Sequence, residues 1–301
     1  MSSEEPSVVV SVVIPCFNQA RFLRDALVSL AAQRYSGHEV VVVDDGSTDD
    51  PAGVTREFGG VRCLRQANRG TAVARNHGLR ESRGCYVVFL DADDRLTPDA
   101  MRVGVEALDR EPRCGLVYGH VRLFGSESDL SACRCPAQTA VTEDHYHELL
   151  RRNYVWSPGA AMYRRTALVE VGGFDPRARG SADFDLNVRI ASRWPIRCHG
   201  QTVLDYREHS ASQSSDPAYM LRSAVSVRRR HRRASLRANE KRALAAGIRT
   251  VQADYGERLL DRMAELARAG AWRAALRCLP PLLHYYPAGV VRRTVRRLRR
   301  P

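Results

Sequence analysis

The feature that most constrains the fold is a short apolar run that stops abruptly at a cluster of carboxylates. The run covers residues 85–90 (CYVVFL), and Asp91, Asp93 and Asp94 follow it. A continuous apolar run of this length, rich in β-branched and aromatic residues, is typical of a fully buried strand. The segment Thr97-Pro98-Asp99 then offers a capping hydroxyl and a proline for the first helical position, so a helix should begin there. The acids are therefore expected at the carboxyl end of a buried strand, where open α/β sheets bind ligands.

Carboxylates this close together favour a bound cation, because their negative charges repel one another. Proteins hold hard ions such as Mg²⁺ and Mn²⁺ with one or two carboxylates together with the phosphate oxygens of a substrate. The triplet can also be a solvated surface turn, since short acidic motifs are common on surfaces. The buried strand in front of Asp91 favours a metal site over a turn.

Strands alternate with helical patterns over residues 1–113. Apolar runs predict strands at residues 8–14, 39–43, 61–64 and 85–90. Such alternation indicates an α/β fold with a mainly parallel sheet and right-handed crossovers. The sequence has neither G-x-G-x-x-G after the first strand nor G-x-x-x-x-G-K-[ST] anywhere, which disfavours a dinucleotide oxidoreductase and a P-loop NTPase.

Four motifs in this half occur in a characteristic order. They are VSVVIPCFNQARFLRDALVSL, VVVDDGSTDD, ANRGTAVARNHGL and FLDADD. In order and spacing they resemble the family 2 glycosyltransferases, which have the GT-A fold, a Rossmann-like, mainly parallel sheet flanked by helices. The resemblance implies an inverting transferase that uses a nucleotide-diphospho-sugar and either Mn²⁺ or Mg²⁺.

The resemblance also implies donor contacts for particular residues, namely Pro15, Phe17, Asp45, Arg75, Asn76, Asp91 and Asp93. Pro15 and Phe17 would line the nucleotide pocket, and Asp45 would form a hydrogen bond with the base. Arg75-Asn76 matches the R-N pair of the family near the donor. Asp91 and Asp93 match its D-x-D motif, with Asp93 as the direct metal ligand. From the residues alone, Phe17 could instead cover the core and Arg75 could lie on a solvated helix face.

Residues 153–194 carry the acceptor side of the resemblance. GGFDP followed by an acidic pair resembles the family motif E-D-x-D, which reads Ala182-Asp183-Phe184-Asp185 in this chain. The match implies that Asp183 is the catalytic base and that Asp185 lies in the acceptor pocket together with Trp156. Ala182 departs from the usual acid. Both aspartates could instead serve the start of a helix, where the helix dipole favours acids, and Trp156 could be a core residue.

A histidine in YREHSASQS, residues 206–214, completes the predicted metal site. His209 matches a histidine that reaches the metal or the diphosphate in some relatives. The resemblance therefore adds His209 to Asp91 and Asp93 as a metal ligand. An exposed loop histidine is the alternative.

The positive charge of the chain is concentrated near its C-terminal end. Residues 218–301 hold 21 Lys or Arg and 5 Asp or Glu, whereas residues 1–217 hold 26 and 29. We therefore expect a GT-A catalytic domain at residues 1–216, with a nucleotide-sugar half at about 1–113 and an acceptor half at about 114–216. A basic helical extension should follow at residues 217–301.

The extension should hold a helical hairpin and then a basic amphipathic helix. Apolar spacing predicts the hairpin at residues 257–279. Beyond Pro287, Val291, Val295 and Leu298 align on one face and arginines fill the rest, which predicts contact with a membrane surface. A disordered basic end is the alternative.

The chain shows no signature of a membrane span, a signal peptide or a zinc site. No run approaches the roughly 18 apolar residues that a span requires, and the N-terminus MSSEEPS lacks the pattern of a signal peptide. These features predict a cytoplasmic protein, with peripheral contact to the inner face of the membrane through its tail. The cysteines form no C-x-x-C pair, and Cys133-x-Cys135 is only a weak metal signal.

The family resemblance therefore implies the metal-dependent transfer of a hexose from a UDP- or dTDP-sugar to a hydroxyl acceptor. The product would be a cell-surface polysaccharide, a glycolipid or a glycosylated natural product, and an acceptor carried on a lipid would suit a tail that contacts membranes. A non-catalytic sugar-nucleotide binder is the alternative that Ala182 favours. The pI of about 9.8 suggests a nucleic-acid-binding protein, but no recognised nucleic-acid module is present, so no nucleic-acid partner is expected.

Overall fold

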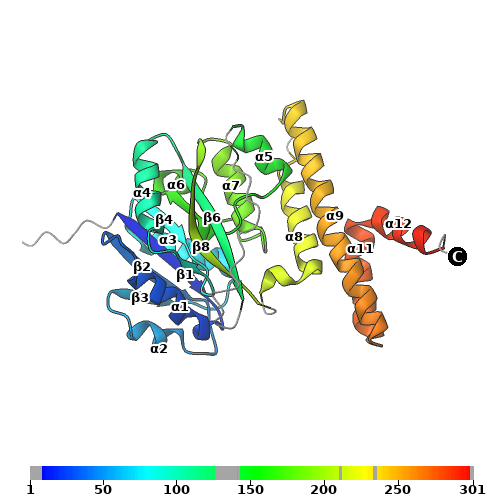
Figure 1. The fold of residues 1–301 in the computed structure, drawn as a ribbon, viewed down its shortest axis with the longest axis horizontal. Helices are drawn as coiled ribbons and strands as arrows, with labels where there is room; N and C mark the ends of the chain where they lie inside the picture. Colours follow the sequence, from blue (N-terminus) through cyan, green and yellow to red (C-terminus); the bar gives the residue numbers. More distant parts are fainter. Residues whose placement is uncertain (1–8, 126–140, 142, 210–211, 233–235, 299–301) are drawn as a thin grey trace, which may run out of the picture. The chain divides into compact units, whose positions relative to one another are not determined.

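The computed structural model describes residues 9–125, 141, 143–209, 212–232 and 236–298, and these form two compact units (Figure 1). The first unit takes in residues 1–146, 153–177 and 182–209, and the second takes in 147–152, 178–181 and 210–301. The second unit thus holds two short internal segments besides the C-terminal region.

One sheet organises the described part of the first unit. Its strands are β1 (Val10–Cys16), β2 (His38–Asp44), β3 (Val61–Arg65), β4 (Tyr86–Phe89), β5 (Arg95–Leu96), β6 (Leu116–Gly125), β7 (Ala161–Arg164) and β8 (Ile196–Glu208). They lie in the order β3-β2-β1-β4-β7-β6-β8-β5. The pairs among β3, β2, β1 and β4 are parallel, and so is β6 with β8. The pairs made by β7 and by β5 are antiparallel. The predicted α/β fold with a mainly parallel sheet is confirmed.

The helices of this unit follow the strands in the predicted alternation. They are α1 (Ala20–Ala31), α2 (Pro51–Arg56), α3 (Thr71–Glu81), α4 (Ala100–Arg110), α6 (Arg165–Glu170) and α7 (Ala182–Ala191). A further helix, α5 (His145–Arg151), begins in the first unit and ends in the second, and a short 3₁₀ turn, η2, covers Pro158–Ala160. Helix α3 packs on β1 and β2, and α4 packs on β6, β7 and β8.

The core forms because β-branched strands meet apolar helix faces. Val12, Ile14 and Val42 are completely buried, and α1 buries its stripe of Leu23, Ala26, Leu27 and Leu30. Helix α3 approaches the sheet so closely that a Cβ atom at Gly78 would lie 2.3 Å from a methyl group of Val13. Only glycine allows this packing distance, which sets the position of α3 over the strand ends.

The prediction that a helix begins at Pro98, capped by Thr97, is wrong. The backbone N–H of Thr97 donates to the carbonyl of Val203, and its hydroxyl donates to the carbonyl of Thr202. Thr97 therefore extends the pairing of β5 with β8, and α4 begins at Ala100. The polar groups that suggested a cap are used by a strand that lies about a hundred residues later in the chain.

The second unit is helical, as predicted. Its helices are α8 (Pro217–Arg230), α9 (Ala238–Arg268), α10 (Trp272–Arg277), α11 (Leu279–Tyr285) and α12 (Pro287–Leu298), and a 3₁₀ turn, η3, covers Gln213–Ser215. A small core joins α8, α9 and α11 through Leu221, Leu259 and Leu282. The first arm of the predicted hairpin is the end of a helix of 31 residues. Among the described residues, no helix is both long enough and apolar enough to cross a membrane.

Candidate donor and acceptor site

The loops that follow β1 and β2 are tied together by reciprocal hydrogen bonds. The N–H of Asn18 donates to the hydroxyl of Ser47 (3.0 Å), and the N–H of Thr48 donates to Oδ1 of Asn18 (2.8 Å). Asn18 has φ of +53°, a conformation that asparagine tolerates better than most residues. The neighbouring Phe17 is 45% exposed at this edge, while Pro15 is buried within β1. Phe17 is therefore a large apolar group exposed at the strand ends, and the place of Phe17 and Pro15 in a nucleotide pocket stays a prediction.

The carboxylate of Asp45 fixes the start of α3. Its Oδ1 accepts hydrogen bonds from the Gln66 side chain (2.7 Å) and the N–H of Arg69 (2.9 Å), and its Oδ2 accepts one from the N–H of Gly70 (2.8 Å). A carboxylate can accept about four hydrogen bonds. The contact of Asp45 with a base stays a prediction, and it would have to use the remaining lone pair.

The acidic loop after β4, residues 91–94, holds two of the predicted metal ligands and contacts the third. Oδ2 of Asp93 accepts a hydrogen bond from the Gln19 side chain (3.1 Å) and lies 2.8 Å from Nε2 of His209. Asp94 is 1% exposed, and its Oδ1 accepts the N–H of Arg207 (3.0 Å). Its Oδ2 is buried and has no hydrogen-bond partner in the described part of the chain. Burial, reinforced by Asp93 and Asp91, raises the pKa of Asp94 well above its usual range. Burial thus disfavours the ionised form of Asp94, which a bound cation would favour.

This donor set suits a hard divalent ion. No group of three His, Cys, Asp or Glu side chains among the described residues is arranged to hold a metal ion by itself. Mg²⁺ and Mn²⁺ sites that are completed by a substrate diphosphate need only one or two carboxylates from the protein. Asp91 and Asp93 supply that number of carboxylates, and metal binding by them and by His209, which lies 2.8 Å from Asp93, stays a prediction.

Arg207 holds the acidic loop in place, and the sequence reasoning missed it. Its Nε donates to the carbonyl of Asp93 (2.9 Å) and an Nη donates to Asp25 (2.6 Å). Its guanidinium lies 4.9 Å from the ring centre of Phe22 and 4.4 Å from that of Phe124. The partners come from α1, β6 and the acidic loop, so the local sequence around Arg207 carried no signal of this role.

Arg75 contacts the acidic loop and acts electrostatically on the predicted base. It lies on α3, is 7% exposed, and donates to Oδ1 of Asp91. Its Nε is buried without a partner among the described residues. Burial raises the pKa of Asp183, and the positive charge of Arg75 opposes that rise. The carboxylates of Asp91 and Asp183 therefore both interact with the positive charge of the buried Arg75.

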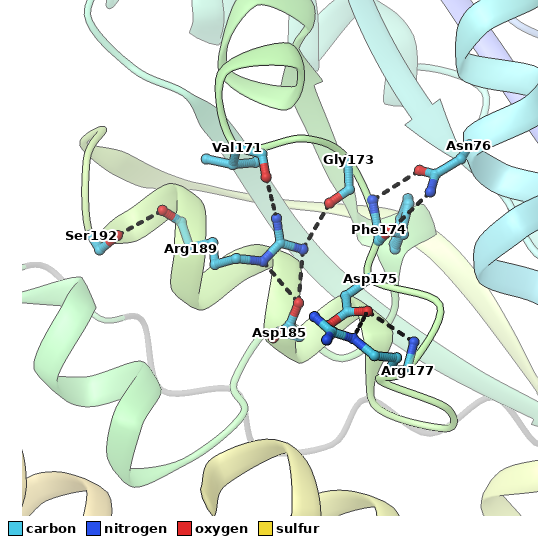
Figure 2. Close-up of polar contacts among 9 residues, drawn as sticks. All are labelled: Asn76, Val171, Gly173, Phe174, Asp175, Arg177, Asp185, Arg189 and Ser192. Carbon is cyan, nitrogen blue, oxygen red and sulfur yellow. Dashed lines mark hydrogen bonds and ion pairs between the residues drawn. The ribbon is translucent and has the colours of Figure 1, made fainter. Parts of the chain in front are cut away.

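Figure 2 shows how the loop before α7 is held. The side-chain amide of Asn76 donates to the carbonyl of Phe174 (2.8 Å) and accepts its N–H (2.9 Å). Gly173 has φ of +67°, and a Cβ atom there would lie 2.6 Å from Oδ1 of Asn76. Since its amide is used to hold this loop, donor contact by Asn76 stays a prediction.

The two aspartates of the predicted acceptor motif have different environments. Arg189 donates to Asp185 (2.8 Å) and to the carbonyls of Val171 and Gly173 (both 2.7 Å), as Figure 2 shows. Asp185 is 5% exposed, so its carboxylate anchors the loop through Arg189. Asp183 is only half-buried. Asp183 is therefore the more accessible of the two carboxylates, and the roles of Asp183 as base and of Asp185 in the acceptor pocket stay predictions. Trp156 is 43% exposed just before η2, so it is not a core residue.

Comparisons with known proteins show which family the chain belongs to. Residues 11–172 match the family model for Glycosyl transferase family 2. The chain is 30% identical over 219 residues to the uncharacterized glycosyltransferase alr2836 of Nostoc sp. (strain PCC 7120), covering 69% of this chain and 67% of that protein. It is 39% identical over 138 residues to the uncharacterized glycosyltransferase YibD of Escherichia coli (strain K12), but the match spans only 35% of that protein and 44% of this chain.

Solved structures share the fold at low sequence identity. Residues 1–349 of Staphylococcus aureus TarS in complex with UDP give a TM-score of 0.60 at 20% identity, covering 80% of this chain and 70% of that one. The mannosyltransferase PcManGT of Pyrobaculum calidifontis, in complex with GDP-Man and Mn²⁺, gives 0.60 at 22% identity, covering 94% and 85%. These likenesses identify the fold as GT-A. With the family match over more than half of its length, the chain belongs to the family 2 glycosyltransferases.

Proposed function

We propose that this chain transfers a sugar from a nucleotide-diphospho-sugar to a hydroxyl acceptor in one inverting displacement, with Asp183 as the general base. The observation that carries the proposal is Arg75, a buried cation that forms a hydrogen bond with Asp91 of the acidic loop and acts electrostatically on Asp183. Asp91, assigned to the donor, and Asp183, assigned to the acceptor, therefore both interact with the positive charge of Arg75.

Asp183 suits the base because of its exposure and its pKa. A hydroxyl is a poor nucleophile at neutral pH, and a positioned base typically accelerates its attack by about 10²- to 10⁴-fold. Burial raises the pKa of Asp183 above its usual range, which makes the carboxylate a stronger base, and the positive charge of Arg75 opposes that rise. Asp183 would take the proton of the acceptor as its oxygen attacks the anomeric carbon.

The donor would lie over the strand ends. Phe17 would cover the base, and the unpaired Nε of Arg75 would donate to an oxygen of the diphosphate or the sugar. Asp91, Asp93 and His209 would hold Mn²⁺ or Mg²⁺, which when bound supplies a Lewis acid that neutralises charge on the departing nucleoside diphosphate. The UDP bound to TarS and the GDP-Man and Mn²⁺ bound to PcManGT support donors of this class.

We propose a UDP- or dTDP-linked hexose as the donor and a glycan or lipid-carried hydroxyl as the acceptor. A panel of UDP-, dTDP- and GDP-sugars, with and without Mn²⁺, tests the donor by thermal shift. A ligand at 100 times its Kd stabilises the native state by about 2.7 kcal/mol, so the correct donor should raise Tm clearly. If no nucleotide sugar raises Tm with metal present, the proposed function is wrong.

A non-catalytic sugar-nucleotide binder is the second candidate, and Ala182 favours it. The family motif usually has an acid at this position, and Ala182 is 8% exposed. Metal-dependent release of the nucleoside diphosphate from the donor separates the two functions. A binder would show the thermal shift without any release.

A further inference from the structure

A cavity of about 500 Å³ in the second unit has no part in the proposed transfer reaction. One face of α9 lines it, through Lys241, Leu244, Ala245, Ile248 and Arg249. These positions recur every three or four residues, so their side chains project from the same side of the helix. Arg232 and Leu236, which precede α9, complete the lining.

The cavity combines an apolar wall with a cationic rim. Leu244 is 2% exposed, and Leu236, Ala245 and Ile248 are half-buried. Arg232, Lys241 and Arg249 are exposed. A long basic side chain can lay its methylene stem along such a wall while its charged head stays at the surface.

The rim keeps its positive charge. In the described part of the chain none of these three cations forms an ion pair, whereas further along α9 Arg258 pairs with Asp254 (3.1 Å). The nearest acid in sequence, Glu240, accepts the backbone N–H of Arg237 (2.6 Å). Residues 222–249 hold ten Lys or Arg and one Glu. The cavity therefore lies in a stretch of the chain that is rich in cations, three of which line it.

The predicted membrane helix is less free than its sequence suggests. On α12, Arg293 lies 2.7 Å from Asp261 and 3.7 Å from Glu257, both on α9, and Arg292 lies 4.0 Å from Glu257. The side chains of Val295 and Leu298 and the arginines at 296–300 lie outside the described side chains. The described charges of α12 are thus partly neutralised, in contrast to those of the cavity.

We propose that this cavity binds the phosphate head group and the first methylenes of an anionic lipid in a bilayer. The cations of the rim match the phosphate, and Leu244 and Ile248 match the methylenes. A nucleic acid would leave this wall facing water, and the lining offers no aromatic ring on which a base could stack. The site lies within the second unit, so lipid binding can be tested separately from the transfer reaction.

Vesicle flotation tests the proposal with the full chain. Arg232→Gln, Lys241→Gln and Arg249→Gln together should weaken binding to vesicles containing phosphatidylglycerol on the order of 100-fold. The control combines Arg268→Gln, Arg273→Gln and Arg277→Gln, which remove the same charge from exposed positions outside the cavity. The control variant should bind these vesicles nearly as well as the unchanged chain does. Vesicles of phosphatidylcholine alone should bind neither the control variant nor the unchanged chain. Equal losses in both variants would mean diffuse charge attraction and would overturn the site.

A second readout needs no variant, because Lys241 is the only lysine of the chain. Anionic vesicles should protect Lys241 from an amine-reactive reagent, measured by mass spectrometry, while inorganic phosphate at the same phosphate concentration should not. The proposal is overturned if Lys241 stays reactive on bound vesicles, if removal of residues 287–301 alone abolishes binding, or if duplex DNA protects Lys241 better than the vesicles do.

Discussion

Arg207→Met tests whether the contacts of Arg207 with the acidic loop matter for donor binding. Methionine keeps an apolar chain between Phe22 and Phe124 and can contact both rings through sulfur. It removes the hydrogen bond to the Asp93 carbonyl and the ion pair with Asp25. The backbone bond from Arg207 to Asp94 should remain.

The structure sets the size of the effect. The lost hydrogen bond is worth about 1 kcal/mol. The pair with Asp25, whose side chain is 41% exposed, is worth at most about 1 kcal/mol after solvent screening. Two cation–π contacts add about 1 kcal/mol in total once methionine replaces part of them. The sum of about 3 kcal/mol should lower Tm by about 6–12 °C. The freed loop should also raise the KM for the donor by about tenfold or more, at nearly unchanged kcat.

Two further variants separate an effect on the position of the acidic loop from an effect on the stability of the fold. Arg122→Met removes the ion pair between Arg122 on β6 and Asp205 on β8 (2.7 Å). It should lower Tm without changing the donor KM. Arg207→Lys keeps the charge but not the forked geometry, so it should recover Tm more than KM. If Arg207→Met lowers Tm as expected while the donor KM stays at the wild-type value, Arg207 has no part in donor binding.

Three other predictions concern the acceptor side. Asp183→Asn should keep donor affinity and lower transfer by at least about 10²-fold; transfer at the wild-type rate would turn attention to Asp185. Because burial raises the pKa of Asp183, kcat/KM should rise as pH increases through that pKa. The protonated form stabilises the fold below the unfolded pKa, and this stabilisation is lost as pH rises through the folded pKa. As pH rises through the folded pKa, the Tm of Asp183→Asn should therefore increase relative to that of the wild type. If the two Tm curves stay parallel over this pH range, the pKa of Asp183 is not raised. Gly173→Ala should destabilise the loop by about 1–3 kcal/mol, since φ is +67° and Asn76 stands in the way; an unchanged denaturant midpoint would exclude this strain.

The parts of the fold that the sequence predicted are those with local causes. A run such as residues 85–90 is a strand because its own side chains must be buried, and β4 lies within one residue of that run at each end. The acids after it were placed correctly for the same reason. The contact of His209 with Asp93 agrees with the family resemblance, although no local pattern around His209 required it.

The parts that the sequence did not predict depend on distant partners. Thr97 looks like a helix cap until β8 takes its hydrogen bonds. The helix pattern alone does not distinguish Asp185 from Asp183, but Arg189 donates both to Asp185 and to the carbonyls of Val171 and Gly173. The first half of α9 carries small residues such as Ala243 and Gly247, which bury little apolar surface, so its pattern was too weak to predict a helix of 31 residues.

Calorimetric titration of UDP, dTDP and GDP tests the central claim most directly. The wild-type chain should bind one of these nucleotides with a Kd at least about tenfold lower when Mn²⁺ is present, because the acidic loop and the diphosphate would share the ion. Asp93→Ala should abolish that difference, while the Arg122→Met control should keep it. If all three nucleotides bind the wild type and Asp93→Ala with the same Kd, or if none binds with Mn²⁺ present, the acidic loop is a surface turn and the proposed donor site is wrong.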